Sequence, residues 1–214
     1  MNTVVHHINN HRFLLLPEKA IIWENKKTLL VADLHLGKIT HFRKAGIAVP
    51  AAAKQENLSR LSDILLNYRI DRVIILGDLF HSHYNATWLD FKQFIAQFIE
   101  IQFILVMGNH DILEAKQYQA PNLEIVPEGL MESEFILTHH PYLHEKAYNL
   151  CGHIHPAIRL RGASKQSITL PCFIFSKSQA ILPSFGTFTG SARIEPKKDD
   201  VVYAITDQEV IKVL

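Results

Sequence analysis

Polar side chains that could bind metal ions follow several apolar runs of this chain. Asp33 and His35 come after the run that ends at Ala32, and Asp78 comes after the run that ends at Leu76. Later runs end in the same way, at Asn109, His139, His153 and His155. Carboxylate, amide and imidazole groups are ligands that Mn, Fe and Zn accept in proteins. The pattern therefore indicates a metal site built from these side chains.

These ligands are enough for two ions that keep open positions for water and substrate. The pairs Asp33/His35 and His153/His155 are expected to lie on strands, with both side chains on one side. Asp78 can give one oxygen to each ion. Two ions about 3.5–4 Å apart stabilise the attacking and leaving oxygens of phosphoryl transfer and lower the pKa of bound water. The expected nucleophile is a hydroxide that bridges the two ions.

Residues beside these ligands could take part in the reaction. His110 directly follows a candidate ligand, so it is expected at the rim of the site, where it could stabilise phosphoryl oxygens or protonate the leaving oxygen. Asp111 could orient His110 and keep it protonated. His139 and His140 are alternatives for one ligand position.

Hydrophobic periodicity predicts the elements that position these residues. Helices are expected over residues 51–68, 88–100 and 112–119. Strands are expected at 12–16, 20–24, 28–32, 72–76, 103–107, 123–126, 134–137, 157–160, 172–175, 179–182 and 201–205. Strands and helices alternate in the first part of the chain, and strands dominate the last part. This order predicts an α/β fold, a sandwich of two mixed β-sheets flanked by helices.

Length and composition predict one soluble domain. The 214 residues carry a formal net charge of +1, so binding of a polyanion would depend on a local patch or on bound metal. A single domain is expected over residues 1–214, because no linker or repeat interrupts the pattern. His6, His7 and His11 are expected in a solvated N-terminal arm.

The cysteines and the apolar runs favour the cytoplasm. Cys151 and Cys172 form neither a CxxC motif nor a disulfide framework, which fits a reducing compartment. Cys151 is interpreted as a small buried residue at a strand end. The N-terminus lacks the pattern of a secretion signal, and no apolar run approaches the ~20 residues of a membrane helix. We therefore expect a cytoplasmic protein without a membrane span.

The ordered motifs resemble those of the calcineurin-like metallophosphoesterases. The resemblance rests on Asp33-x-His35, Gly77-Asp78, Gly108-Asn109-His110-Asp111, His139 and Gly152-His153-x-His155. It implies a two-layer β sandwich with a dinuclear metal centre. One ion would be held by Asp33, His35, Asp78 and His155, and the other by Asp78, Asn109, His139 and His153. The family pattern also favours His139 over His140, and Mn²⁺ over Fe or Zn.

Other segments resemble a narrower bacterial group, the PdeM or ligase-associated DNA damage response endonucleases. These segments are residues 32–38, 42–46, 152–160 and 182–190. The resemblance implies a DNA endonuclease of DNA repair, with a DNA ligase and a helicase-like nuclease as partners. Lys38, Arg43 and Arg159 lie near the first and last motifs and could hold substrate phosphates. The alternative for these three residues is an ordinary solvated face.

Three functions stay open at this stage. A phosphodiesterase acting on DNA or another nucleic acid is favoured, because the spacers between motifs are too short for a capping domain. A small-molecule phosphodiesterase, for cyclic nucleotides, dinucleotides or a nucleotide-linked lipid, would use the same ligands with different pocket walls. A non-catalytic scaffold ranks last, because such relatives lose ligands and none is missing here.

Overall fold

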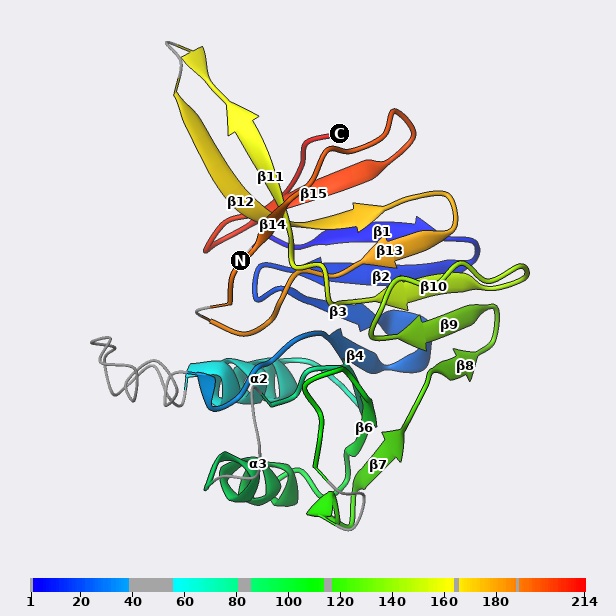
Figure 1. Cartoon of the computed structure of the whole chain (residues 1–214), viewed down its shortest axis with the longest axis vertical. Coiled ribbons are helices and arrows are strands. Elements are labelled where there is room, and N and C mark those ends of the chain that lie inside the picture. Colours follow the sequence, from blue (N-terminus) through cyan, green and yellow to red (C-terminus); the bar gives the residue numbers. More distant parts are fainter. Residues whose placement is uncertain (1, 39–55, 81–85, 114–116, 164–165, 188) are drawn as a thin grey trace.

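Two β-sheets packed face to face form the body of the computed structural model (Figure 1). The structure describes residues 2–38, 56–80, 86–113, 117–163, 166–187 and 189–214. Among these residues, one sheet has seven strands and the other has nine. The expected α/β sandwich of two mixed sheets is therefore confirmed.

The seven-stranded sheet joins an antiparallel meander to a parallel half. Its strands follow chain order: β1 (Val4–Ile8), β2 (His11–Leu16), β3 (Ala20–Trp23), β4 (Thr28–Val31), β5 (Arg72–Leu76), β6 (Gln102–Val106) and β7 (Leu123–Val126). The short 3-10 helix η1 (Glu24–Lys26) connects β3 to β4. Strands β1 to β4 pair antiparallel, whereas β4 to β7 pair parallel. The parallel half therefore brings its carboxyl ends to one edge of the sheet.

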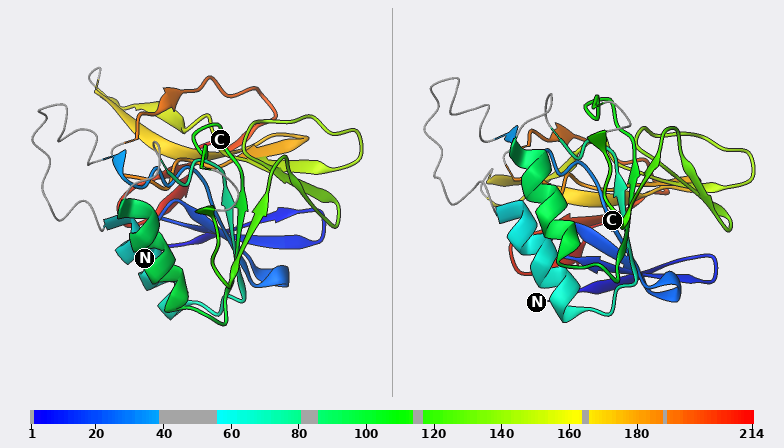
Figure 2. Two further views of the ribbon diagram at one scale, coloured as in Figure 1. Left: turned by 60° about the horizontal axis from the view of Figure 1, so that its bottom comes forward. Right: turned by 90° about the horizontal axis from the view of Figure 1, so that it is seen from below.

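Strands β4, β5 and β6 are buried on both faces, which explains their continuous apolar sequences. In β5, Val73 and Ile75 pack towards the helices, and Ile74 and Leu76 face the second sheet. Helices α2 (Glu56–Asn67) and α3 (Ala86–Ala96) lie side by side on the outer face (Figure 2). No described helix is long and apolar enough to cross a membrane.

The helix ends differ from the predicted ones. Residues 51–55 of the first expected helix lie outside the described residues, as do 114–116 of the third. The described residues of the third expected helix, 112–113 and 117–119, form no α-helix, so the prediction is wrong for them. The second ends at Ala96 rather than at residue 100. The N–H groups of Gln97 and Phe98 bond to carbonyls three residues back, so the chain tightens into turns after α3.

The nine-stranded sheet carries the second half of the chain. The strand order is β14 (Ala192–Arg193), β11 (Pro156–Arg161), β12 (Ser167–Phe175), β13 (Gln179–Ile181), β10 (Tyr148–Cys151), β9 (Phe135–Thr138) and β8 (Leu130–Glu132). β12 also pairs with β15 (Val201–Ile205), which pairs with β16 (Val210–Lys212). β9, β10 and β13 run parallel, so the turns after β9 and β10 emerge at one edge.

The core between the sheets is rich in aromatic rings. Trp23 and Phe13 of the first sheet meet Phe135 of the second, with ring centroids 4.8 and 5.5 Å from it. All three side chains are fully buried. Edge-on contacts of this kind add to the free energy of apolar burial, and here they join the two layers.

The prediction of a solvated N-terminal arm is wrong. His6 lies in β1, its Nδ1 is 3.0 Å from the Tyr203 hydroxyl, and its ring lies 3.9 Å from that of Phe175. His11 begins β2 and accepts a hydrogen bond of 3.0 Å from the Trp23 indole. Alternate residues of an edge strand can face the core. The N-terminal segment can therefore form a strand although its histidines are polar.

Candidate metal centre

The candidate ligands lie in turns that follow strand ends in both sheets. The turns come after β4, β5 and β6 of one sheet and β9 and β10 of the other, and they carry Asp33, His35, Asp78, Asn109, His139, His153 and His155. The carboxyl ends of parallel strands are where such sheets hold their ligands. The structure therefore brings all of these predicted side chains to one region.

Neither ligand pair lies on a strand, contrary to expectation. Asp33 and His35 follow β4 with φ of 55° and 46°, and His153 and His155 follow β10 with φ of 67° and 51°. Asp78 has φ of 50°. A left-handed backbone is uncommon in residues other than glycine and concentrates at functional sites. In the Asp33/His35 and His153/His155 turns the left-handed conformation recurs two residues on.

One group of ligand atoms gathers around Asp33. The ligand atoms of Asp33, His35 and His155 lie within 4.8 Å of one another. His155 Nε2 is 3.4 Å from Asp33 Oδ1, and His35 Nε2 is 3.7 Å from Asp78 Oδ2. Asp33, His35 and Asp78 are buried. These four side chains could hold one ion.

A second group gathers around His139. Its Nε2 lies 3.0 Å from Asn109 Oδ1, 3.0 Å from His153 Nδ1 and 3.5 Å from Asp78 Oδ1. Asp78 thus turns one oxygen towards each group. The structure thus brings together the side chains that the family resemblance implies for each ion, and it also places ligand atoms of Asp33, Asp78 and His139 within 4.8 Å of one another. The division of the candidate ligands between two ions stays a prediction.

Backbone carbonyls fix the orientation of two of the imidazoles. Nδ1 of His139 lies 3.0 Å from the Leu76 carbonyl oxygen, and Nδ1 of His155 lies 3.0 Å from that of Gly190. A carbonyl can only accept, so each Nδ1 carries the proton and each Nε2 keeps its lone pair for a metal.

The donor set fits divalent metal ions. Asp33 Oδ1 and His155 Nε2 are buried and have no hydrogen-bond partner among the described residues. Burial lowers the pKa of His155, but the Asp33 carboxylate outweighs it and the net shift is upward. The pKa of His153 is lowered, chiefly by burial. Facing acceptor atoms in a buried site are satisfied by a cation, and mixed oxygen and imidazole donors suit Mn, Fe or Zn.

The described part of the segment 184–190 holds the Asp33 turn from outside. Ser184 Oγ donates to the Asp33 carbonyl at 2.8 Å, and the Gly186 N–H donates to the same oxygen at 3.1 Å. The Phe185 N–H donates to the Ala32 carbonyl at 2.8 Å. The same segment supplies the Gly190 carbonyl that faces His155. In the sequence, this segment contributes to the resemblance to the endonuclease group but has no assigned role at the site.

Asn57 is a site residue that the sequence reasoning missed. It is buried near the start of α2, and its Nδ2 donates to the Leu34 carbonyl at 3.0 Å. Its Oδ1 accepts from the Thr187 N–H at 3.0 Å. Asn57 therefore ties the Asp33–His35 turn to the segment 184–190. The only sequence signal was an asparagine among the apolar positions of an amphipathic helix.

His110 lies beside the ligands, and Asp111 supports the loop. The His110 N–H donates to Asp78 Oδ1 at 3.0 Å, and its ring lies 5.6 Å from that of His35. The orientation of His110 by Asp111 stays a prediction; the Asp111 oxygens accept from the N–H groups of Gly108 and Phe80, at 2.8 and 3.3 Å. Burial raises the pKa of Asp111 to about 6. Asp111 therefore acts on the backbone that carries Asn109 and His110.

The neighbours of the ligands differ in exposure. His139 is buried, whereas His140 is exposed with its ring 4.1 Å from that of His153. His139, His140 and His153 form another group that could hold a metal ion. Cys151 is fully buried, as expected, and burial raises its pKa to about 12.

The predicted phosphate-binding residues are not all at the centre. Lys38 is half-buried; burial lowers its pKa while the charge of Asp78 raises it. Arg159 is exposed in β11 and donates to Ser167 Oγ at 2.7 Å. Arg43 lies outside the described residues. Of the two predicted residues that the structure describes, Lys38 lies close enough to a candidate ligand for the charge of Asp78 to act on it.

Fold and site together define a metal-dependent phosphoesterase. The family model of the calcineurin-like phosphoesterases matches residues 26–168, and the chain belongs to this family. The crystal structure of Pseudomonas putida nuclease MPE is 29% identical, covers 99% of this chain and 100% of that chain, and has a TM-score of 0.84.

A second solved structure is much less similar. A protein of unknown function, AQ665 from Aquifex aeolicus, is 18% identical over 60% of this chain and 78% of that chain, with a TM-score of 0.43. No curated protein sequence matches the chain. The class of enzyme thus rests on the family model, the site and the similar nuclease structure.

Proposed function

We propose that this protein is a dinuclear metal-dependent phosphodiesterase that cleaves DNA. The proposal is carried by Asp78, whose two oxygens face separate groups, 3.7 Å from His35 Nε2 and 3.5 Å from His139 Nε2. A carboxylate so placed is suited to bind two ions at once. The similar structure of a nuclease supports a nucleic-acid substrate.

The metal ions, His110 and Lys38 would have different roles in this reaction. Two divalent ions, for which we propose Mn²⁺, would supply an activated water and offset phosphate charge when bound. His110 lies at the rim beside His35, where its imidazole can donate a proton to the leaving oxygen. Lys38 lies close enough to Asp78 for their charges to interact. Its ammonium can therefore hold a phosphoryl oxygen at the centre.

The proposed setting extends beyond the site. The chain would act as one domain over residues 1–214 in the cytoplasm, as a DNA endonuclease of DNA repair. A DNA ligase and a helicase-like nuclease would be its partners. These proposals rest on the family resemblance and on the sequence features given above.

A small nucleotide is the second candidate substrate. A cavity of about 460 Å³ adjoins the centre and includes Met107, His139, His140 and Tyr142 in its wall. A cavity of this size, with an aromatic ring and a ligand histidine in its wall, can take a nucleoside. It favours a small phosphodiester over a non-catalytic scaffold.

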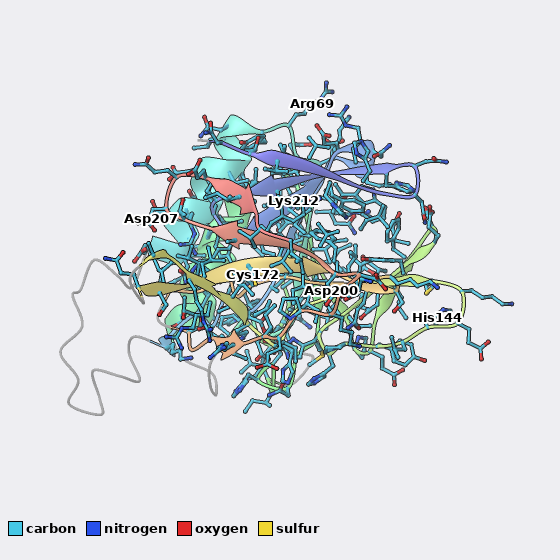
Figure 3. The ribbon with its side chains drawn as sticks, turned by 90° about the horizontal axis from the view of Figure 1, so that it is seen from above. Arg69, His144, Cys172, Asp200, Asp207 and Lys212 are labelled. Carbon is cyan, nitrogen blue, oxygen red and sulfur yellow. The ribbon has the colours of Figure 1, made fainter. Side chains whose placement is uncertain are left out.

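Turnover of matched substrates tests the proposal. Purified protein, Asp78→Asn and the exposed control Asp207→Asn are incubated with Mn²⁺ and three substrates: a synthetic diester, the matching monoester and single-stranded DNA. Asp207 lies in the β15–β16 turn, and Figure 3 labels it. The expected result is cleavage of diester and DNA by wild type and Asp207→Asn, with loss in Asp78→Asn.

Each other outcome has a definite meaning. Cleavage of the synthetic diester without DNA would move the substrate to a small nucleotide. No turnover of any substrate, with both ions bound, would overturn the enzymatic proposal and favour a scaffold.

A further inference from the structure

A two-stranded ribbon leaves the candidate metal centre. β11 begins at Pro156, directly after His155, and residues 158–161 pair with 167–170 of β12. Among the described strands, β14 pairs only with Pro156 and Ala157, and β15 pairs with β12 only from residue 172 onwards. Figure 1 shows this ribbon reaching out from the body of the sandwich.

One face of the ribbon is basic. Side chains alternate along a strand, so Ala157, Arg159 and Arg161 share a face. The register places Ser167 opposite Arg161 on that face, and Arg193 of β14 beside Ala157. Arg159, Arg161 and Arg193 are all exposed. Three guanidinium groups from two neighbouring strands therefore line the same face.

The sequence around the ribbon has no carboxylate. No aspartate or glutamate occurs between Glu145 and Glu195, although the whole chain has 21 of them. The formal charge of the chain is only +1, so positive charge is concentrated here and balanced elsewhere. A polyanion along this face would meet the charges of the three arginines, and Glu195, two residues after Arg193, is the first carboxylate that follows them in the sequence.

The length of the ribbon distinguishes a polymer from a small substrate. Arg161 is six residues beyond His155, about 20 Å away at roughly 3.3 Å per strand residue. DNA carries one phosphate per roughly 3.4 Å of axis on each strand. A dinucleotide held at the metal centre would not reach Arg161, whereas a strand of several nucleotides would.

We propose that this basic ribbon is the arm that holds a nucleic-acid strand beyond the phosphate being cleaved. The proposal rests on the proposed nuclease function and specifies how a polymer would be preferred over a small nucleotide. Arg159 and Arg161 contact successive phosphates, and Arg193 lies where the strand leaves the centre. Such contacts position the strand without reading its sequence.

Salt-dependent binding tests the arm. The double variant Arg159→Gln/Arg161→Gln is compared with the control Arg69→Gln/Lys92→Gln, which removes the same charge from exposed positions before β5 and on α3. Figure 3 places Arg69 well away from β12. The probe is labelled single-stranded DNA of about 20 nucleotides, titrated without divalent metal between about 50 and 200 mM salt.

The expected result has two parts. The slope of log Kd against log salt becomes shallower by about 1.4 in the ribbon variant, because two phosphate contacts are lost. The kcat/KM for DNA, divided by that for a small synthetic diester, falls about tenfold. Arg159→Lys/Arg161→Lys keeps the charge and should recover most of the binding, which separates a charge effect from misfolding.

Failure of the arm proposal can be distinguished from failure of the nuclease proposal. Wild type that cleaves DNA, with a ribbon variant that matches it in slope and ratio, would overturn the arm and leave the nuclease proposal standing. Wild type that cleaves the small diester but neither binds nor cleaves DNA would overturn both. Equal loss in the ribbon variant and the control would also overturn the arm.

Discussion

The side-chain amide of Asn57 donates a hydrogen bond of 3.0 Å to the carbonyl oxygen of Leu34. Leu34 lies between the candidate ligands Asp33 and His35, so this bond fixes the peptide group between Leu34 and His35. The bond is buried and spans from α2 to the turn after β4. A helix residue that bonds to the backbone between two candidate ligands thus helps to set the distance between them.

Replacing this amide should weaken metal binding. Asn57→Asp keeps an acceptor for Thr187 but turns an oxygen towards the Leu34 carbonyl. We expect a loss of 10-fold or more in Mn²⁺ affinity by calorimetry, as is typical for groups that orient ligands. Asn122→Asp is the matched control, because the Asn122 amide donates to three carbonyls, one in the last turn of α3 and two in the residues that follow it. Equal losses of affinity in both variants would contradict the positioning role.

Gly77 leaves no room for a side chain beside His139. An added methyl would overlap atoms of the His139 side chain, and Gly77 has φ of 77°. Gly77→Ala should displace the imidazole from the Leu76 carbonyl and reduce the bound metal towards one ion per chain. Metal content by mass spectrometry checks this. Gly162→Ala, where a methyl meets only ordinary contact with Gln166, should keep the wild-type content.

The two neighbouring histidines should differ in metal binding. His139 is buried with its Nε2 3.5 Å from Asp78 Oδ1, whereas His140 is exposed. We expect His139→Asn to lose one ion and at least 100-fold in kcat, and His140→Asn to keep both ions. Metal content and diester turnover of the two variants check this. The reverse result would assign the ligand position to His140.

The buried Asp33 carboxylate should destabilise the folded chain when no metal is bound. Its side chain is fully buried, and Oδ1 has no hydrogen-bond partner among the described residues. Asn at this position can donate to His155 Nε2. Asp33→Asn should therefore raise the Tm in chelator by about 2–4 °C for each kcal/mol by which it stabilises the folded chain. Mn²⁺ should raise the Tm of wild type but not of the variant. A lower Tm in chelator, measured by calorimetry, would contradict the prediction.

His6 should make stability fall in mild acid. Burial lowers its pKa from 6.5 to about 4, with help from the charge of His7. Between about pH 6.5 and 4, His6 is protonated in the unfolded chain but neutral in the folded chain. The free energy of unfolding therefore declines as the pH falls through this range. After allowance for solvent screening at a half-buried ring, the decline from pH 7 to 5 should be about 1 kcal/mol smaller in His6→Phe. Parallel urea titrations check it, and identical declines would exclude His6 as the cause.

The sequence determined the strand-end positions and chemical types of the candidate ligands. Apolar runs such as residues 72–76 and 103–107 predicted buried parallel strands, and both strands lie within one residue of the expected positions. The residues after those runs carry carboxylate, amide and imidazole groups, and their order along the chain indicated the family. Hydrophobic periodicity and side-chain chemistry are local properties, so one chain is enough to show them.

Only the tertiary structure decided how the ligands are held. The bond from Ser184 Oγ to the Asp33 carbonyl joins residues 151 positions apart, and its acceptor is a backbone oxygen that every residue possesses. The left-handed turn at Asp33, the partners of Asn57 and the strand formed around His6 likewise depend on segments distant in sequence. Backbone hydrogen bonds and long-range packing leave no local signature, because any residue can supply a carbonyl and the partner is fixed only when the sheets close.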